Sequence, residues 1–176
     1  MKRRSTKGIL ILVLIFVLAS TGLAQQNVGV INSQEVLEKS VEGKKVLNQL
    51  QQRDKDYQKQ IANQDEEIRN LETKLNTQRL TLTNEALAQL SSDIERRQTD
   101  RKRFAEDKVR ELQELTARLF QRIQNELIPI IEQIGKEKNL DIIFDLAKSG
   151  AIYFNPAINV TQDLIQKYDA SKSSSK

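Results

Sequence analysis

The chain has no cysteine and no histidine. It therefore lacks thiol nucleophiles, imidazole general bases and the ligands of most zinc sites. It also lacks a glycine-rich phosphate loop, a G-x-S-x-G sequence and a calcium-binding loop pattern. We predict that the protein is not an enzyme and that it needs no cofactor or metal.

Glycine and proline are missing from one long stretch. The 85 residues between Gly43 and Pro129 contain neither. In the first half of this stretch, eight of the twelve heptad a and d positions counted from Leu47 to Glu85 are apolar. A sustained period of about 3.5 residues with charged flanks predicts a long helix that lies against another helix. It disfavours a single surface helix of a globular domain, because such helices average only about 11 to 12 residues.

The long stretch can form one straight rod, roughly 130 Å long, or fold back on itself. A reversal at Asn84 and Glu85 would place residues whose numbers add to 169 opposite one another. The acidic residues between 65 and 72 would then face the basic residues between 97 and 103, and Thr83 and Asn84 would be N-cap candidates for the returning helix. The apolar and charge patterns together favour the hairpin over the rod.

We expect residues 44–128 to form this antiparallel coiled-coil hairpin, with its reversal near residues 83–86. Polar residues at some seam positions, Gln64 and Gln78 among them, would weaken the packing of the arm. The predicted seam residues are Leu47, Leu50, Tyr57, Ile61, Ile68, Leu71, Leu75, Leu82, Leu87, Ile94, Leu112 and Leu119.

Residues 1–24 have the pattern of a secretory signal peptide. Basic residues come first, an apolar run of eleven residues follows from Ile9 to Ala19, and Gly22 and Ala24 are the small residues that a signal peptidase reads. The apolar run is shorter than the ~20 residues that a membrane-spanning helix needs. We therefore favour a signal cleaved after Ala24 over an uncleaved membrane anchor, and we expect the protein to be exported.

Net charge does not point to nucleic acid as a partner. The formal charge of +4 comes entirely from the four basic residues of the predicted signal, because the rest of the chain has 24 Lys and Arg against 24 Asp and Glu. A formally neutral mature chain is not expected to bind nucleic acid through its net charge.

Short elements flank the long stretch and together form a small body, which we assign to residues 25–43 and 129–168. Residues 27–32 alternate like a short strand, and Ser33 is an N-cap candidate for a short helix after it. A body this small cannot bury a core adequate to hold two long arms. Without disulfides or a metal, self-association is the remaining source of stability.

The C-terminal part of the body is predicted to contain a β-hairpin. Residues 141–146 read as a strand, residues 148–150 as a turn, and residues 151–154 as the partner strand. We expect Thr161 to cap a last helix and residues 169–176 to form a disordered tail.

Sequence motifs at the two ends of the chain carry a family resemblance. They lie at residues 28–32, 35–37 and 42–44 and, toward the C-terminus, at residues 130–137, 140–144, 151–154 and 160–165. This set of motifs resembles the Skp/OmpH family of periplasmic chaperones. The resemblance covers essentially the whole chain after the signal, although Val41 stands where the family commonly has a proline.

The resemblance implies an α+β fold, mainly helical, in which three copies of the chain assemble as a homotrimer. Strands of the three subunits would form a central β body, and three helical hairpins would project from it like tentacles around a cavity. The resemblance also implies an ATP-independent periplasmic holdase that keeps unfolded outer-membrane β-barrel proteins in that cavity. The residues assigned to the trimer body are Val28, Val30, Ile142, Phe144, Ile152 and Phe154.

Two further groups of residues are candidates for contact with clients or lipid. They are the leucines near the tip, Leu80 and Leu90, and the bases Arg96, Arg97, Arg101, Lys102 and Arg103. The bases have two interpretations: contact with anionic lipid, lipopolysaccharide or acidic client segments, or ion pairs across the hairpin with Glu66, Glu67 and Glu72. Charged faces are common in coiled coils, so we favour the ion pairs. The rival function is that of a structural or adaptor coiled coil of the cell envelope.

Overall fold

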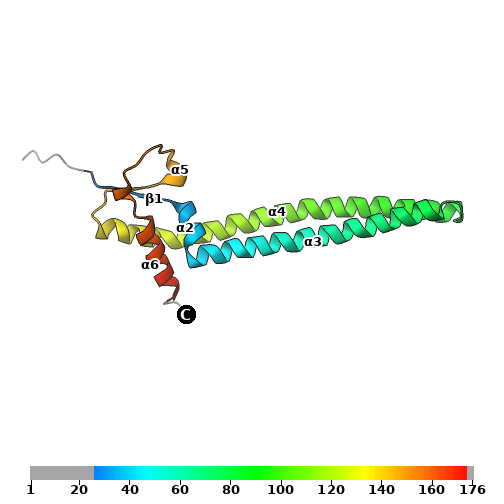
Figure 1. Cartoon of the computed structure of the whole chain (residues 1–176), viewed down its shortest axis with the longest axis horizontal. Helices are drawn as coiled ribbons and strands as arrows, with labels where there is room; N and C mark the ends of the chain where they lie inside the picture. The colour runs from blue at the N-terminus through cyan, green and yellow to red at the C-terminus, as the bar shows by residue number, and fades with distance from the viewer. Residues whose placement is uncertain (1–25, 174–176) are drawn as a thin grey trace, which may run out of the picture.

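The computed structural model describes residues 26–173. The predicted signal peptide at residues 1–24 lies outside the described residues, as do residues 174–176. Figure 1 shows a small body at one end of the molecule and two long helices that extend from it. The elements are, in chain order, β1 (Val28–Ile31), α2 (Ser33–Lys39), α3 (Val41–Gln78), α4 (Asn84–Glu137), β2 (Ile142–Asp145), α5 (Leu146–Ser149), η1 (Pro156–Ile158) and α6 (Thr161–Ser173).

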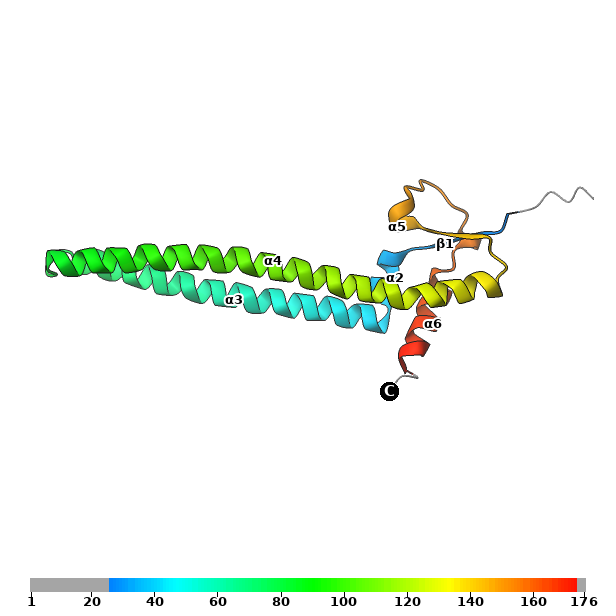
Figure 2. The same ribbon diagram turned by 180° about the vertical axis from the view of Figure 1, so that it is seen from behind.

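The long helices α3 and α4 lie side by side over most of their length, as both ribbon views show (Figures 1 and 2). A turn at residues 79–83 joins them, and the Thr83 hydroxyl caps α4 by accepting a hydrogen bond from the amide of Ala86 at 3.2 Å. α3 therefore ends at Gln78, before the expected reversal at residues 83–86, while α4 begins where the Thr83 cap predicts.

Contacts between α3 and α4 show how the two helices face each other. The hydroxyl of Tyr57 donates a hydrogen bond to Glu111 at 2.6 Å, and Arg101 pairs with Asp65 at 2.8 Å. The later residue of α3, Asp65, pairs with the earlier residue of α4, Arg101. The two helices therefore run in opposite directions. We call the part of this helix pair within residues 44–128 the arm.

The two helices of the pair differ in length, with 38 residues in α3 and 54 in α4. Glu42, in the first turn of α3, pairs with Arg122 of α4 at 2.7 Å. The residues of α4 beyond this point therefore continue past the start of α3, and Ile134 reaches the core of the body. α4 is thus the element that runs from the tip of the arm into the body.

The sheet of the body has two parallel strands. β1 and β2 pair from Val28 beside Ile142 to Ile31 beside Asp145. Parallel strands need a crossover connection, and here the connection contains α2, α3 and α4. The sheet therefore brings the two ends of the long helical segment back to one place.

The predicted partner strand at residues 151–154 is wrong. After β2 the chain forms α5, which ends at Gly150 in the left-handed conformation with a φ of 66°. This helical turn carries the chain away from β2 instead of folding it back along the strand. Residues 151–154 form no strand, and β2 pairs with β1 instead.

Two predicted helix caps are each displaced by one residue. Asn32, not Ser33, caps α2, and its side-chain oxygen accepts hydrogen bonds from the amides of residues 34 and 35, each at 3.1 Å. Thr161 does not cap α6 but is its first residue, and its buried hydroxyl accepts a hydrogen bond from the amide of Asn32 at 3.0 Å.

The expected disordered tail at residues 169–176 is helical as far as the structure describes it. α6 extends to Ser173. Asp169 and Lys172 have partners on the long helices, at Val41 and Glu126 respectively. These contacts stabilise turns of helix that the composition of the tail does not predict.

The hydrophobic core of the body lies where α2, the end of α4 and α6 meet. Leu164, Ile165 and Tyr168 recur with a spacing that puts them on one side of α6. They form one buried cluster with Val36 of α2 and Ile134 of α4. The cluster continues into the first turns of α3, so the base of the arm is part of the core.

Gly43 marks a very close approach between α2 and α3. A Cβ atom at this position would lie 2.1 Å from the carbonyl oxygen of Leu37, which real side chains do not tolerate. The same turn is capped by the buried Ser40, whose hydroxyl accepts a hydrogen bond from the Gly43 amide at 3.0 Å. Glycine therefore lets α3 start this close to α2, which gives a physical reason for the glycine in the motif at residues 42–44.

Replacing Gly43 by alanine should destabilise the protein by about 1–3 kcal/mol, because the added methyl group overlaps backbone atoms. Urea unfolding followed by circular dichroism measures the change. Gly135→Ala is the matched control, since Gly135 is also helical but its new methyl group would meet Ile143 at an ordinary 3.7 Å. This control should gain slightly in stability from helix propensity. Equal unfolding midpoints for the two variants would contradict the importance of the close approach.

Candidate interaction surfaces

Large apolar side chains are exposed on the body. Ile142 and Phe144 of β2 are 44% and 45% exposed, Tyr153 is 85% exposed, and Ile152 is fully exposed. Exposed apolar groups of this size and number make this part of the body a candidate interaction surface. Of the residues assigned to the trimer body, Ile142, Phe144 and Ile152 are exposed, Val28 and Phe154 are half-buried, and Val30 is buried.

An apolar groove of about 810 Å³ lies between α2, α4 and the segment formed by β2 and α5. Phe120 and Ile128 of α4 line it and remain partly exposed. The heptad pattern missed both residues because they lie off the seam. With Val109 they occur at spacings of 11 and 8 residues, which places all three on one broad side of α4. That spacing is the sequence signal for this surface.

The twelve predicted seam residues are all shielded from water to some degree. Tyr57, Ile68, Ile94 and Leu119 are buried, and the other eight are half-buried. Half-burial is the expected state in a pair of helices, because no third layer covers the pair. The arm therefore keeps apolar surface close to water along its length.

Tyr57 anchors the middle of the arm through a polar contact. Its hydroxyl donates to Glu111, and the Lys108 ammonium lies 5.1 Å from the centre of its ring. Burial, followed by the bond to the Glu111 carboxylate, raises the pKa of Tyr57 above its ordinary 10.0. Hydrogen bonds from Lys108 and then Tyr57 hold the pKa of Glu111 below its ordinary 4.5. The contact therefore links the two helices over the whole physiological pH range.

Two bases of the cluster on α4 form ion pairs across the arm. Arg97 pairs with Glu67 at 2.9 Å and Arg101 with Asp65 at 2.8 Å. Of the three expected partners, Glu67 pairs with the cluster, but it pairs with Arg97, opposite which the expected register placed Glu72; the partner of Arg101, Asp65, is not among the three. Long side chains reach acidic partners diagonally across the helix pair, so the pairing differs from the residues that lie directly opposite.

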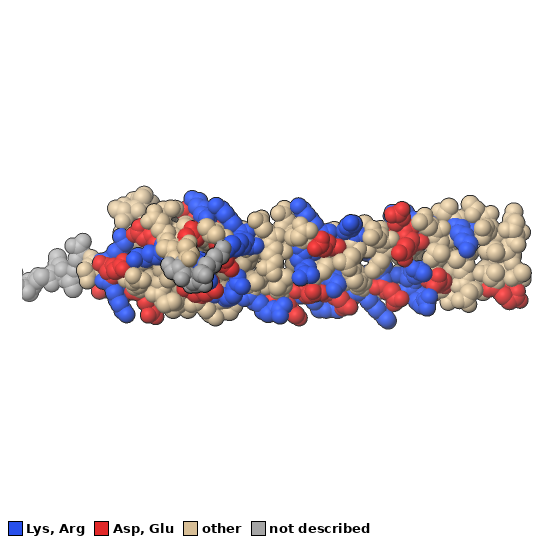
Figure 3. Space-filling view, turned by 90° about the horizontal axis from the view of Figure 1, so that it is seen from below, with Lys and Arg blue, Asp and Glu red and all other residues tan. Residues whose placement is uncertain are grey.

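The other three bases of the cluster are exposed. Arg96 pairs with Asp93 of its own helix at 2.6 Å. Lys102 and Arg103 form no ion pair with any residue in the described range 26–173. Figure 3 shows basic and acidic side chains interspersed along the arm rather than separated into patches of one sign. On this face the charges of the arm therefore largely balance over short distances.

The tip of the arm presents an apolar side chain to solvent. Leu80 lies in the turn between α3 and α4 and is 97% exposed. Leu90, the other leucine assigned to client contact, is half-buried on α4. Of the two, Leu80 is the residue with its side chain available to a partner.

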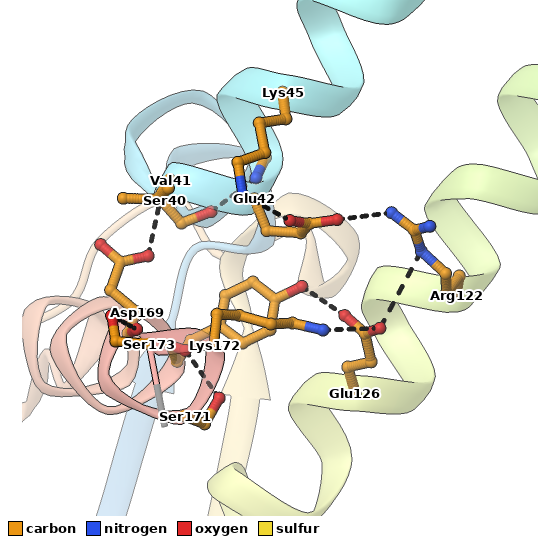
Figure 4. A network of polar contacts seen from close by, with 12 residues as sticks. Ser40, Val41, Glu42, Lys45, Arg122, Glu126, Asp169, Ser171, Lys172 and Ser173 are labelled. Atoms are coloured by element: carbon orange, nitrogen blue, oxygen red, sulfur yellow. Dashed lines mark hydrogen bonds and ion pairs between the residues drawn. The ribbon is translucent and has the colours of Figure 1, made fainter. Parts of the chain in front are cut away.

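A polar network lies at the base of the arm, where α3, α4 and α6 meet (Figure 4). The buried Tyr168 donates its hydroxyl proton to Glu126 at 2.5 Å, and Lys172 pairs with the other oxygen of that carboxylate at 2.8 Å. Arg122, one turn earlier, reaches Glu42 of α3 at 2.7 Å. Sequence reasoning missed this network because its members come from three distant segments and form no local motif.

The charges of this network are stable at neutral pH. Burial alone would raise the pKa of Glu126, but hydrogen bonds from Lys172 and Tyr168 outweigh it and hold the pKa below its ordinary 4.5. Burial and the bond to the Glu126 carboxylate raise the pKa of Tyr168 well above its ordinary value. At neutral pH the Glu126 carboxylate is thus held between the hydroxyl group of Tyr168 and the ammonium group of Lys172.

Within residues 26–173, the structure places no three potential metal-ligating side chains together. Over the same residues, no helix is both long enough and apolar enough to span a membrane. The fold defines the class of the protein as one in which a small body that contains the strands carries a long helical arm.

Residues 27–168 match the family model described as Outer membrane protein (OmpH-like), so the chain belongs to the OmpH-like family. The resemblance inferred from the motifs at the two ends of the chain is confirmed by this match. Proteins of this family are generally not enzymes, and membership supports a chaperone role.

A crystal structure of a candidate outer membrane chaperone (OmpH-like) from Caulobacter crescentus resembles the chain with a TM-score of 0.76. The match covers 85% of this chain and 88% of that chain, at 19% sequence identity. At this identity the likeness establishes the fold, which is mainly helical with a small body that contains the strands. No curated protein matches the chain.

We expect Asp65→Asn to lower the melting temperature at neutral pH and to have less effect as the solution becomes acidic. The hydrogen bond from Arg101 holds the pKa of Asp65 below its ordinary 3.8 in the folded protein. A depressed folded pKa stabilises the fold above the unfolded pKa, and this contribution is lost as the pH falls through the folded pKa. Melting curves measured from neutral pH down to about pH 2 follow the loss.

Glu66→Gln is the matched control for Asp65→Asn. Glu66 is exposed, lies next to Asp65 and forms no ion pair with another described residue. Its replacement should leave the melting temperature nearly unchanged at every pH. Equal losses for the two variants at neutral pH would show that the pair with Arg101 does not stabilise the arm.

Proposed function

We propose that the protein is an ATP-independent holdase of the periplasm that binds unfolded outer-membrane β-barrel proteins and prevents their aggregation. In the proposed assembly, three chains join through their bodies, and three antiparallel helical hairpins surround a cavity that receives the client. The observation that carries the proposal is the OmpH-like match over residues 27–168, in a chain whose apolar body surface is exposed beside a long arm.

The surface of the body supports self-assembly. In the proposed homotrimer, neighbouring chains cover Ile142, Phe144, Ile152 and Tyr153, which a single chain leaves in water. Asn159 bridges to Val30 at the outer edge of β1, so among the described residues β2 forms the open edge of the sheet, and such edges readily pair with another chain. Covering both features stabilises a body whose own core is small.

The arm supports the holdase role. An unfolded barrel protein exposes alternating apolar residues along its strands and needs shielding without tight binding. The half-buried seam leaves apolar surface near water, and Val109, Phe120 and Ile128 add partly exposed apolar side chains on one broad side of α4. These scattered contacts are individually weak, so a client held by many of them can still leave.

The proposed location is the periplasm. It rests on the predicted signal peptide with cleavage after Ala24 and on the family, whose members are typically periplasmic. A holdase in that compartment works without ATP, which agrees with a sequence that has no glycine-rich phosphate loop.

Two rival or additional roles remain distinct from the holdase. A structural or adaptor coiled coil of the envelope would bind one folded partner stably and would not protect unfolded chains. Anionic lipid, including lipopolysaccharide, is a proposed additional partner at the exposed Lys102 and Arg103. That contact predicts binding to anionic vesicles that weakens with salt and is lost when both residues become glutamine.

The holdase is tested by diluting a urea-unfolded outer-membrane barrel into buffer with and without the mature chain. We expect the chain, at three copies per client, to suppress turbidity, and light scattering of the chain alone to give the mass of three copies. Undiminished aggregation at this ratio would overturn the chaperone function. A monomeric mass would overturn the trimer.

A variant on the body surface tests the assembly separately. Changing Ile152 and Tyr153 together to lysine places charges on the exposed surface and should reduce the mass to that of one chain. Val109→Lys is the control, because Val109 is exposed on the arm and its replacement should leave the mass unchanged. Retention of the full mass by the double lysine variant would place the interface elsewhere.

A further inference from the structure

The arm joins the body through a weakened turn of α4. Pro129 lies inside this helix and has no N–H, so the carbonyl of Asn125 loses its usual helical partner. Sharp bends in helices occur mostly at such positions. The core of the body holds α4 on both sides of the proline, through Leu127 before it and Ile134 after it, and the arm extends outward from the Leu127 side. Pro129 therefore weakens one turn of α4 at the junction between the arm and the body.

α6 contacts both long helices next to this junction: α3 at its first residue, just before the arm begins, and α4 within the arm, three residues before the proline. Tyr168 and Lys172 bind the carboxylate of Glu126, three residues before it, at 2.5 Å and 2.8 Å. Asp169 accepts a hydrogen bond at 2.9 Å from the amide of Val41, the first residue of α3. Figure 4 shows these contacts converging from α6 on the two arm helices.

The other end of α6 is fixed in the body. Leu164 and Ile165 are buried in the core, and the Thr161 hydroxyl accepts a hydrogen bond from the amide of Asn32 at 3.0 Å. A helix of 13 residues is stiff over its roughly 20 Å length. One end of α6 therefore belongs to the body while the other end holds the arm.

We propose that α6 is a brace in which Tyr168, Asp169 and Lys172 hold the arm at a fixed direction to the body, across the weakened turn at Pro129. The brace is a property of the chain itself and does not depend on the proposed chaperone function. Two of its three residues, Asp169 and Lys172, lie after residue 168, where the match to the family model ends.

Val41→Pro is a selective test of the brace. Proline is favoured at the first position of a helix, and the preceding Ser40 already has the extended backbone that precedes proline, with a φ of −67° and a ψ of 154°. The substitution therefore removes the N–H group that donates a hydrogen bond to Asp169, and it leaves the start of α3 intact. Asp169→Ala breaks the same bond from the other side, so the two changes combined should have no more effect than either alone.

The direction of the arm is measured on the mature chain with spin labels. The chain has no cysteine, so Ala147→Cys on α5 and Gln113→Cys on the arm, both at exposed positions, give one labelled pair. Labelled chain is mixed with an excess of unlabelled chain, so that only distances within one chain are seen. We expect Val41→Pro, Asp169→Ala and Tyr168→Phe each to broaden the distance distribution, and amide exchange at residues 126–134 to become roughly tenfold faster.

Two controls distinguish a brace from a general loss of stability. Tyr57→Phe removes an equivalent tyrosine–glutamate bond in the middle of the arm and should leave the distance distribution unchanged. Pro129→Ala restores the missing helical hydrogen bond and should suppress the broadening caused by the brace variants. Unchanged distributions in the three brace variants, or equal broadening with and without Pro129, would overturn the proposal even if their melting temperatures fall.

Discussion

The hydrophobic core of the body is the interaction on which the rest of the structure depends. It gathers α2, the first turns of α3, the last turns of α4 and α6 into one buried cluster. The sheet closes the same region, since the amide of Asn27 bonds to the carboxylate of Asp141, 114 residues away. Closing so long a loop loses chain entropy, and burial in the body is what offsets that loss. The arm has only its two helices for support, so its position is decided at its base.

Charge contributes to the arm in a different way from apolar packing. The ion pairs of Arg97 and Arg101 join the helices on their partly exposed flanks, where each pair adds little stability by itself. They also favour one register, because a shifted helix pair would separate Arg97 from Glu67 and Arg101 from Asp65. At the base, by contrast, the carboxylate of Glu126 is partly buried and has several donors, and contacts of that kind are harder to break one at a time.

The long helices could be predicted from the sequence because their signal is local. The absence of glycine and proline, the heptad pattern from Leu47 onward and the cap at Thr83 each depend on residues close together in the chain. The motifs at the two ends led to the family for a similar reason, and Gly43 now has a steric explanation. The features that depend on residues close together in the chain could therefore be predicted.

The remaining features depend on contacts between distant segments. Residues 151–154 have the composition of a strand, but composition does not say which edge a strand will pair with, and α5 carries this segment away from β2. Asn32 and Ser33 are both good caps, and only geometry selects the first. The groove at Phe120 and the network around Tyr168 each combine residues of several helices. No periodic pattern in the sequence therefore predicts them.

The base of the arm and its tip are separated by a heptad seam with a few polar positions, Gln64 and Gln78 among them. The body contacts lie at one end, the Thr83 cap closes the other, and the helices between them meet through a pattern of about seven residues. Adding seven residues to each helix would lengthen the arm by about 10 Å and leave the seam in register. Arm length is thus a dimension that evolution can adjust by duplicating heptads, without redesigning either the turn or the body.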